Sequence, residues 1–325
     1  MQKHVLQWHI LHRCNLHCTH CYQEDHAGEL PFETLVSFLH QYQAFCSAMH
    51  FRGHINLTGG EPLLSEHLFP LMDLLERGGI TCGILSNGTC ITAETAARLA
   101  GYDCLRFVQV SIDGTRETHD SIRGAGSFDR AFAGLRHLRR AGIQTMAAFT
   151  CHQRNYQELP DVIRLMRRHR IDRFWADRLV PIGGSKEDIL TNEQFRTVLR
   201  ILTKEHERKR LFSRTDVHLN RAMQFLEGGN CYYHCAAGTT LLTLLADGTL
   251  LPCRRLPIPI GNCRTDDMLT LWQNSPLIAS LRREEIPERC IACPRAPLCR
   301  GGAKCLTYAV TGKLSDRDIN CDYRF

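Results

Sequence analysis

The sequence predicts an α/β fold followed by a smaller, cysteine-rich region with a β-hairpin. Between residues 5 and 206, six strand-like segments alternate with six helix-like segments, a pattern typical of βαβ units on a parallel sheet. Polar residues and glycines recur where successive strand-like segments end. After about Lys204 the composition changes to short segments and frequent cysteine. Six units are too few for a closed eight-stranded barrel, so periodicity alone allows a partial barrel or an open sheet.

Each strand-like segment is a short apolar run, and each helix-like segment spaces its apolar residues as one helical face requires. The expected strands are Val5–Leu11, His54–Thr58, Thr81–Ser86, Arg106–Ile112, Gln144–Thr150 and Asp172–Leu179. The expected helices are Phe32–His50, Leu68–Arg77, Ala93–Ala100, Phe128–Arg140, Tyr156–His169 and Asn192–His206. Thr92 and Thr191 are the expected N-caps of the third and sixth helices. Gly78 and Gly142 follow the second and fourth helices and would end them.

The last third of the chain predicts a separate, smaller domain. Leu241–Ala246 and Thr249–Leu251 flank Asp247-Gly248, a two-residue loop that favours a β-hairpin. A charged stretch that begins at Lys204 connects this region to the first one. We therefore expect a first domain over residues 1–206, a linker over 207–230 and a second domain over 231–325.

The composition excludes several classes of protein. The 17 cysteines among 325 residues are less dense than in a small disulfide scaffold, and an odd number cannot all pair with one another. The apolar run Val5–Leu11 is too short for a secretory signal, and no stretch approaches the ~18–20 apolar residues that span a bilayer. We therefore expect a cytoplasmic protein with no membrane partner and with reduced thiols, for which metal binding is the first explanation to test.

The positive charge is concentrated in one short stretch. Between Arg136 and Arg173, nine arginines accompany three acidic residues, a surplus equal to the formal net charge of +6 for the whole chain. A solvated outer helix face is the simpler interpretation. Docking of an acidic peptide or a tRNA-like partner is the alternative. Because no aromatic residues alternate with these arginines as stacking platforms, we expect no nucleic-acid partner.

Three closely spaced cysteines follow the first expected strand. They are Cys14, Cys18 and Cys21, in the segment C-N-L-H-C-T-H-C. A structural zinc ion would need a fourth ligand, which His12, His17 or His20 can each supply. A 4Fe–4S cluster with three cysteine ligands would leave one iron open to bind a further ligand. Spacing alone leaves both possibilities open.

Polar and glycine residues follow the next three strands at the point where each ends. The segments are Thr58-Gly59-Gly60-Glu61-Pro62, Ser86-Asn87-Gly88-Thr89 and Ser111-Ile112-Asp113-Gly114. Parallel α/β folds bind ligands at this end of their sheets. The two adjacent glycines would allow a ligand to approach the backbone closely, and Glu61 would accept a hydrogen bond from an ammonium group.

With this combination, residues 5–205 resemble the radical S-adenosylmethionine (SAM) family. That family has C-x3-C-x2-C in the loop after its first strand, followed by G-G-E-P, and both motifs stand here in order. The resemblance implies a partial (β/α)6 barrel. It also implies that a low-potential cluster passes one electron to SAM, and that the resulting 5′-deoxyadenosyl radical takes a hydrogen atom from a substrate.

The resemblance also implies roles for individual residues. Cys14, Cys18 and Cys21 would hold the 4Fe–4S cluster that binds SAM. The implied SAM contacts are Gln23, Gly59, Gly60, Glu61, Ser111, Arg123 and Val180. Glu61 and the glycine backbone would meet the amino group of SAM. Ser111 would meet its ribose or carboxylate, Arg123 its carboxylate, and Val180 would lie on the adenine side.

Eight of the nine cysteines in the C-terminal region, all except Cys263, form a second set of candidate ligands. They are Cys231, Cys235, Cys253, Cys290, Cys293, Cys299, Cys305 and Cys321. Eight thiols fit two sites of four ligands each, and spacing alone leaves two zinc sites open. The region resembles the SPASM extension of radical SAM enzymes, which holds two auxiliary 4Fe–4S clusters. One departure is the gap between Cys299 and Cys305, which is five residues where the SPASM pattern has three.

The SPASM resemblance implies how these cysteines divide between two sites. Auxiliary cluster I would take Cys231, Cys235, Cys253 and Cys305. Auxiliary cluster II would take Cys290, Cys293, Cys299 and Cys321. Three 4Fe–4S clusters in all would then use eleven of the cysteines.

The resemblance to SPASM-bearing enzymes indicates the general kind of substrate and does not identify the substrate itself. SPASM-bearing enzymes mostly modify peptides and proteins, and some act on tetrapyrroles or sugars. Sulfatase-maturing members carry an aspartate directly after the cysteine equivalent to Cys253, where this chain has Arg254 followed by Arg255. The missing aspartate weakens the sulfatase interpretation. Two cations there would suit a carboxylate-bearing substrate, and a role at the protein surface is the alternative.

The leading hypothesis is a radical SAM maturase that modifies a peptide. The alternative enzyme is a small-molecule oxidase or decarboxylase that acts on a tetrapyrrole or sugar. A non-catalytic iron–sulfur or zinc protein for electron transfer represents a different class. Expected partners are a flavodoxin-type or ferredoxin-type reductant and, since the barrel begins near residue 5, a separate leader-peptide-binding protein or a direct leader contact with the Arg136–Arg173 stretch.

Overall fold

The computed structural model describes residues 1–23, 29–182, 186–212, 214–218, 222–228, 233, 235–283 and 285–324, without the side chains of residues 209–212. Within this part of the chain, one sheet has the strand order β10-β9-β8-β1-β2-β3-β4-β5-β6-β7. Its strands are β1 (Gln2–His9), β2 (Phe51–Thr58), β3 (Thr81–Ser86), β4 (Leu105–Ser111), β5 (Thr145–Cys151), β6 (Arg173–Arg178), β7 (Asp216–Val217), β8 (Leu241–Leu244), β9 (Thr249–Leu251) and β10 (Gly261–Asn262). Each neighbouring pair from β1 to β7 is parallel.

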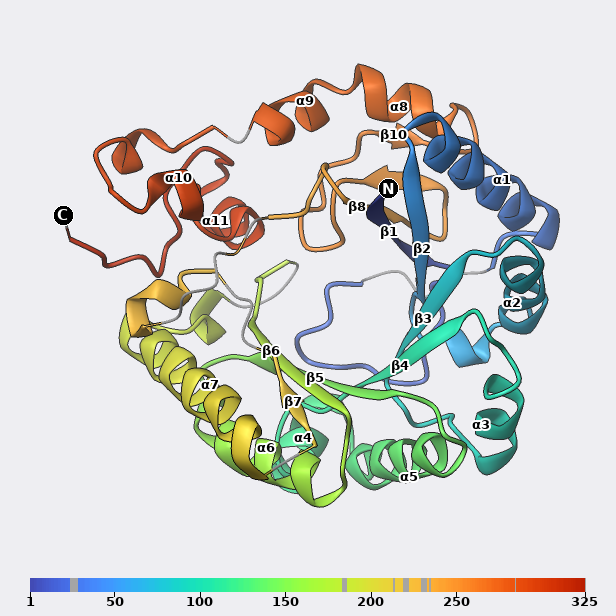
Figure 1. The fold of residues 1–325 in the computed structure, drawn as a ribbon, viewed down its shortest axis with the longest axis horizontal. Helices are drawn as coiled ribbons and strands as arrows, with labels where there is room; N and C mark the ends of the chain where they lie inside the picture. Colours follow the sequence, from blue (N-terminus) through green and yellow to red (C-terminus); the bar gives the residue numbers. More distant parts are fainter. Residues whose placement is uncertain are drawn as a thin grey trace.

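Most of the helices lie outside this curved sheet, whereas α10 (Ala296–Cys299) and α11 (Lys304–Thr311) lie to one side of it in the C-terminal region (Figure 1). The other helices are α1 (Phe32–Ala48), α2 (Leu68–Arg77), α3 (Ala93–Leu99), α4 (Arg116–Arg123), α5 (Ser127–Arg140), α6 (Leu159–Arg168), α7 (Asn192–Phe212), α8 (Met268–Asn274) and α9 (Pro276–Arg283). β10 and β7 are the two edges of the sheet, so the barrel is not closed. The partial barrel is thus confirmed.

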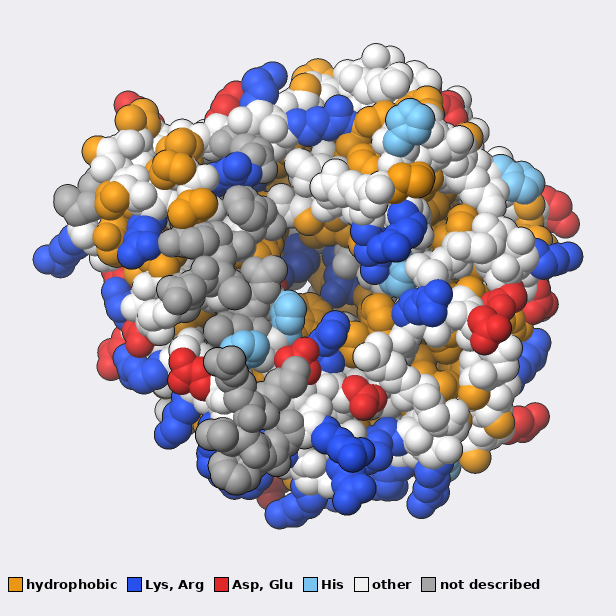
Figure 2. All heavy atoms as spheres, viewed as in Figure 1, with side chains coloured by type: hydrophobic (Ala, Val, Ile, Leu, Met, Phe, Trp, Pro, Cys, Tyr) orange, Lys and Arg blue, Asp and Glu red, His pale blue; other side chains and the backbone are white. Residues whose placement is uncertain are grey.

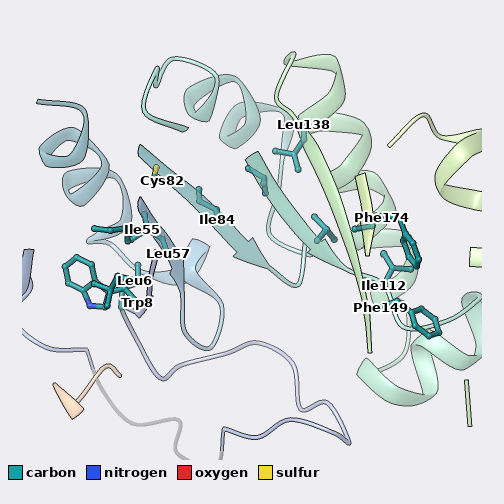
Figure 3. Close-up of a cluster of buried hydrophobic side chains, with 14 of the residues drawn as sticks. Leu6, Trp8, Ile55, Leu57, Cys82, Ile84, Ile112, Leu138, Phe149 and Phe174 are labelled. Carbon is teal, nitrogen blue, oxygen red and sulfur yellow. The ribbon is translucent and has the colours of Figure 1, made fainter. Parts of the chain in front are cut away.

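The main core lies between the strands and the surrounding helices. In β5, Ala147 and Phe149 are buried while Ala148 and Thr150 on the opposite face are partly exposed. This alternation follows from the two-residue repeat of a strand and separates a helix-facing side from an interior side. Figure 3 shows buried side chains of successive strands packed together with Leu138 of α5. The partly exposed face of the strands therefore points to the interior of the barrel, where there is room for polar residues and a ligand.

The C-terminal hairpin extends the barrel sheet instead of forming a sheet of its own. β8 and β9 are antiparallel around Asp247-Gly248, as expected, and β8 also pairs in parallel with β1. The segment expected as a linker contains β7, which pairs with β6. The boundaries of the two domains stay a prediction, but the sheet runs from one region into the other.

Most elements lie where the sequence predicts them, with three instructive differences. The first strand is Gln2–His9, and not Val5–Leu11, because residues 10 and 11 leave β1 to contact the end of β2. α7 continues to Phe212, past the expected end at His206, because the following charged residues are good helix formers. α4 was not expected, since most of its eight residues are polar.

No helix in the described residues is long and apolar enough to cross a membrane.

Candidate active site

A cavity of about 200 Å³ lies at the carboxyl ends of the parallel strands. Interior-facing residues of three adjacent strands meet there: Ser111 of β4 pairs in register with Ala148 of β5, which pairs with Trp175 of β6. The loop that carries Cys14, Cys18 and Cys21 closes one side of the cavity. The molecule is hollowed near the centre of the face in Figure 2, and basic side chains are visible inside the hollow.

The cysteine loop is held against the end of β2 by its backbone. The Gly60 N–H donates to the Leu11 carbonyl at 3.0 Å, and the Glu61 N–H donates to the Arg13 carbonyl at 2.9 Å. A Cβ atom on Gly59 would collide with the carbonyl of Leu11, and one on Gly60 with that of Arg13. The two glycines therefore admit the cysteine loop itself, and both also line the cavity. The sequence-based explanation, close approach of a ligand, omitted this backbone contact.

The three thiols of the loop influence one another electrostatically. Burial raises the pKa of Cys18 to about 11, the Arg123 charge opposes that rise, and the Cys21 and Cys14 thiolates add to it. The amide of Asn87 lies 3.8 Å from the sulfur of Cys14. Three thiols gathered in one polar loop are a donor set that fits an iron–sulfur cluster.

Glu61 connects the ends of two strands. Its carboxylate is fully buried and accepts hydrogen bonds from the Ser86 hydroxyl at 2.8 Å and the Asn87 N–H at 2.7 Å. It also accepts one from the Leu63 N–H at 3.2 Å. Burial raises its pKa to about 7 against these three donors. The expected ammonium contact stays a prediction, because all three hydrogen bonds go to the protein.

Arg123 lies beneath the cysteine loop and is not a surface residue. It is 9% exposed, its Nε donates to the Asp113 carboxylate at 2.6 Å, and its Nη1 lies 3.7 Å from the sulfur of Cys18. His20 faces the same carboxylate at 3.4 Å. Burial acts to raise the pKa of Asp113, but the charges of Arg123 and His20 outweigh it and the pKa is lowered. A cation is thus fixed beside the thiols.

The other expected SAM contacts also line the cavity. Ser111, Val180 and Gln23 all border it, and the Gln23 amide donates to the His12 carbonyl at 3.2 Å. His20 borders it too, and its Nδ1 atom is buried without a hydrogen-bond partner among the described residues. An unpartnered polar atom at the cavity wall fits a site that receives a polar ligand.

Three of the four cysteines expected at auxiliary cluster I come together. Burial raises the pKa of Cys305 to about 12, the Arg255 charge opposes the rise, and the Cys253 and Cys235 thiolates add to it. Cys305 lies in the first turn of α11, which returns the chain to the hairpin. Cys231 lies outside the described residues. The structure thus brings Cys305 to the first site despite the altered spacing.

The four cysteines expected at auxiliary cluster II also come together. Cys290, Cys293, Cys299 and Cys321 line one small cavity. The longer gap between Cys299 and Cys305 is taken up by a tight turn in which Gly301 and Gly302 both have a φ of +84°. A Cβ on Gly302 would lie 2.6 Å from the side chain of Asp318. The extra residues therefore fold against the segment that leads to Cys321.

A single zinc ion would need three or more ligands around one point. In the described chain, no three His, Cys, Asp or Glu side chains are close enough together to hold a single metal ion in this way.

The two adjacent arginines of the C-terminal region have different surroundings. Arg255 forms an ion pair with Asp177 and donates to the Arg178 carbonyl at 2.6 Å, so its charge is already compensated. Arg254 borders the cavity, as does Tyr22, and its charge opposes the rise that burial causes in the pKa of Tyr22. Within the described residues it has no carboxylate partner. Burial lowers the pKa of nearby His9 to about 3, and the charge of Arg254 contributes to the decrease.

Family models match both regions of the chain. Residues 8–166 match the radical SAM superfamily, and residues 235–294 match the SPASM iron–sulfur cluster-binding domain. The chain belongs to the radical SAM superfamily. Membership implies SAM binding and 4Fe–4S clusters, and with them a radical SAM enzyme.

Relatives with different substrates resemble this radical SAM protein over nearly its whole length. An AdoMet-dependent heme synthase of Methanosarcina barkeri is 26% identical, over 98% of this chain and 96% of its own. The mycofactocin maturase MftC of Mycobacterium ulcerans is 29% identical, over 97% of this chain and 87% of its own length. The crystal structure of Streptococcus suis SuiB bound to SAM matches 99% of this chain and 78% of its own, with a TM-score of 0.80 and 18% identity. SuiB therefore shares the fold of this chain.

Several residues of the site were not expected from the sequence. Asp113 was noted only as part of a strand-end segment, and its pairing with both Arg123 and His20 depends on α4. Trp175, whose indole N–H donates to Gln109 at 2.7 Å, was not singled out. Helical spacing of His119, Ile122 and Arg123 (i, i+3, i+4) is the signal that would have placed Arg123 on a buried helix face.

Proposed function

We propose that this chain is a radical SAM maturase that removes a hydrogen atom from a carboxylate-bearing peptide. The observation that carries the proposal is the shared cavity, in which the cysteine loop, the strand ends and Arg254 of the C-terminal region face one space. With cluster and SAM bound, the chemistry supplied is one-electron cleavage of SAM to a 5′-deoxyadenosyl radical. The chain itself positions the reactants and excludes water.

The proposed roles follow the positions of the residues. Cys14, Cys18 and Cys21 hold the SAM-binding cluster, and the Arg123 guanidinium, paired with Asp113, lies beside them. Gln23, Gly59, Gly60, Ser111 and Val180 border the space that SAM would occupy. Glu61 keeps the ends of β2 and β3 together through Ser86 and Asn87. Cys235, Cys253 and Cys305, with Cys231, hold auxiliary cluster I, and the cavity of Cys290, Cys293, Cys299 and Cys321 holds auxiliary cluster II.

The charge of Arg254 supports a carboxylate on the substrate. A cation that lines a cavity without a carboxylate partner can form a strong, charge-assisted pair with a bound anion. Support for a peptide comes from the maturase relative and from SuiB, a protein of the same fold that has been solved with a precursor peptide. A small flavodoxin-type or ferredoxin-type protein would supply the electrons, and a separate protein could bind a leader peptide.

A tetrapyrrole is the second candidate substrate. The heme synthase relative matches this chain over 96% of its own length, and propionate side chains would meet Arg254 as a peptide carboxylate would. Both candidate substrates therefore predict a carboxylate paired with Arg254. They differ in whether a peptide or a tetrapyrrole increases the formation of 5′-deoxyadenosine.

The first experiment tests the SAM chemistry. We expect the anaerobically reconstituted protein, with dithionite and SAM, to form 5′-deoxyadenosine. Replacing Cys14, Cys18 and Cys21 together by alanine should abolish this product and leave iron bound in the C-terminal region. Cys90→Ala is the matched control, because Cys90 adjoins the loop, 3.5 Å from the Asn15 amide, but has no assigned role. A triple variant that still forms the product would contradict the proposal.

The second experiment tests the substrate. A peptide with a free carboxylate should increase 5′-deoxyadenosine formation more than its amide, and Arg254→Gln should raise the KM for the former. Arg264→Gln is a control, because Arg264 is exposed and lies outside the cavity. Stimulation by an iron porphyrin with propionates and by no peptide would favour the tetrapyrrole candidate instead.

A further inference from the structure

A second hollow, of about 480 Å³, lies where α5 and α6 end. Five arginines line it, together with His169 and three apolar residues, and no lining residue is acidic. We refer to the set as the arginine groove, made up of Arg136, Arg139, Arg140, Arg168 and Arg170. The catalytic proposal above does not use it.

The arginines of the groove differ from their neighbours in their pairing. Arg164, Arg167 and Arg173, which flank the groove in sequence, each pair with a carboxylate. None of the five groove arginines has an ion pair within the described chain. Arg139 donates to the His169 carbonyl at 2.6 Å, a contact that leaves its charge uncompensated. Within the Arg136–Arg173 stretch, the arginines around the hollow therefore have no carboxylate partner among the described residues, whereas the three named neighbours outside it each have one.

The positive charges converge on one place. The pKa of His169 is lowered, first by burial and then by the charges of Arg136, Arg168 and Arg139. The helix dipole favours basic residues in the last turn, as with Arg139 and Arg140 of α5 and Arg168 of α6. Arg170, just past the end of α6, adds a further charge at the same hollow. Like charges held together without a counterion destabilise the protein, and a bound anion removes that cost.

The groove and the cavity lie at opposite ends of the sheet. Ile171, in the groove, precedes β6, whereas Asp177, in the cavity, is near the end of that strand. At ~3.3 Å per residue, the strand between these two residues spans roughly 20 Å. An extended peptide would therefore need at least about six residues to reach from the groove to the cavity. A ligand of the groove therefore cannot be the reacting group itself.

We propose that the arginine groove binds an acidic stretch of the peptide substrate, remote from the residue that is modified. The inference rests on the proposed function, because it takes the substrate to be a peptide. Five guanidinium groups around one hollow complement several carboxylates, which pair strongly with arginine. A nucleic acid is a poorer match, since Phe132, the phenyl ring in the groove, is only 3% exposed and offers no face for stacking.

The binding test uses the full chain and a fluorescein-labelled decapeptide of alternating Glu and Gly, measured by fluorescence anisotropy. We expect saturable binding that weakens as salt increases, and little binding of the matching Gln peptide. Arg139→Glu with Arg168→Glu should weaken binding by about tenfold or more, equivalent to ~1.4 kcal/mol. The matched control, Arg264→Glu with Arg283→Glu, changes the net charge equally at exposed positions outside the groove and should leave binding nearly unchanged.

Two results would overturn the inference. One is equal loss of binding in the groove variant and in the control variant, which would show that only net charge matters. The other is tighter binding of a single-stranded oligonucleotide than of the acidic peptide. Circular dichroism melts of both variants check that each is folded.

A separate measurement distinguishes failure of the groove from failure of the proposed function. The groove variant should form 5′-deoxyadenosine without peptide at the wild-type rate, because the groove is remote from the cavity. It should show a raised KM only for substrates with an acidic stretch. If the wild-type protein forms no 5′-deoxyadenosine at all, the proposed function fails, while the anisotropy result still decides whether the groove binds acidic peptide.

Discussion

Buried charged side chains hold the strand ends of this protein in place. Glu61 shows the effect most directly, because one oxygen of its carboxylate accepts from Ser86 and Leu63 and the other accepts from Asn87. A carboxylate has two acceptor oxygens, whereas an amide has one, so no uncharged residue of the same size can repeat this arrangement. Glu61 therefore adds three hydrogen bonds that hold the ends of β2 and β3 together beside the cavity.

At about pH 9, above the raised pKa of about 7, Glu61→Gln should lower the free energy of unfolding by about 1–3 kcal/mol, because one buried N–H or O–H donor loses its acceptor. Urea denaturation followed by circular dichroism measures the change. Glu66→Gln is the control, since Glu66 is exposed and forms none of the three hydrogen bonds that Glu61 accepts. Equal stability of the two variants would show that Glu61 does not hold the strand ends.

At the scale of elements, α4 is the piece that positions Arg123 beneath the cysteine loop. The helix ends at Gly124, whose φ of +104° turns the chain directly into α5. Asp120 closes this turn, because its carboxylate accepts from the Gly126 N–H and the Phe128 N–H, both at 2.8 Å. The H-D-S-I-R-G segment is therefore a structural unit as well as the source of a cation.

Asp120→Ala should lower the free energy of unfolding by about 1–2 kcal/mol at pH 7, as loss of a helix-capping carboxylate does. Burial acts to raise the pKa of Asp120, but the two N–H donors lower it below 3.8 overall. The stabilisation is therefore fully present above pH 3.8 and is lost as pH falls through the lower, folded-state pKa.

Urea denaturation between pH 7 and pH 3 measures this dependence. The difference between wild type and Asp120→Ala should stay constant down to about pH 4 and then decrease. Glu117→Ala, an exposed change in the same helix, is the control. A difference that grows as the pH falls would contradict the assigned role.

At the scale of the whole molecule, one buried ion pair links the barrel to the C-terminal region. Arg178, at the end of β6, donates two hydrogen bonds of 2.8 Å to Asp318 and a third to Asn320. Its guanidinium also lies 4.2 Å above the ring of Phe195. Asp318 accepts the Ala303 N–H as well, next to α11 with Cys305. The strand that borders the cavity and the segments that carry the auxiliary cysteines are thus packed as one unit.

Asp318→Asn should destabilise the protein by about 3–5 kcal/mol, because it leaves the charge of Arg178 buried and unpaired. Calorimetry of the cluster-loaded protein should show a lower Tm. Asp316→Asn is the matched control, two residues away and without an ion pair among the described residues. A Tm for Asp318→Asn equal to that of the control would show that the pair does not join the two regions.

Much of the fold and the donor residues of the site follow from local sequence patterns. The strand and helix order follows from residue periodicity, and the loop cysteines and strand-end segments follow from their spacing, because both depend on neighbours in the chain. α4 escaped prediction because its buried face includes His119 and Arg123, which polarity alone assigns to the surface. Pairing of β8 with β1 escaped it because contacts between strands far apart in sequence leave no local pattern.

The cysteine spacing and the G-G-E-P segment predict the class of chemistry through their resemblance to the radical SAM family, since both motifs are local in the chain. Only the tertiary structure decides how the remaining residues are used. It directs Arg254 into the cavity and pairs Arg255 with Asp177, although the two are adjacent in sequence. It also brings Cys305 to Cys253 through the turn at Gly301 and Gly302. These outcomes depend on packing between distant segments, where the burial of a charge or a thiol is decided by what lies against it.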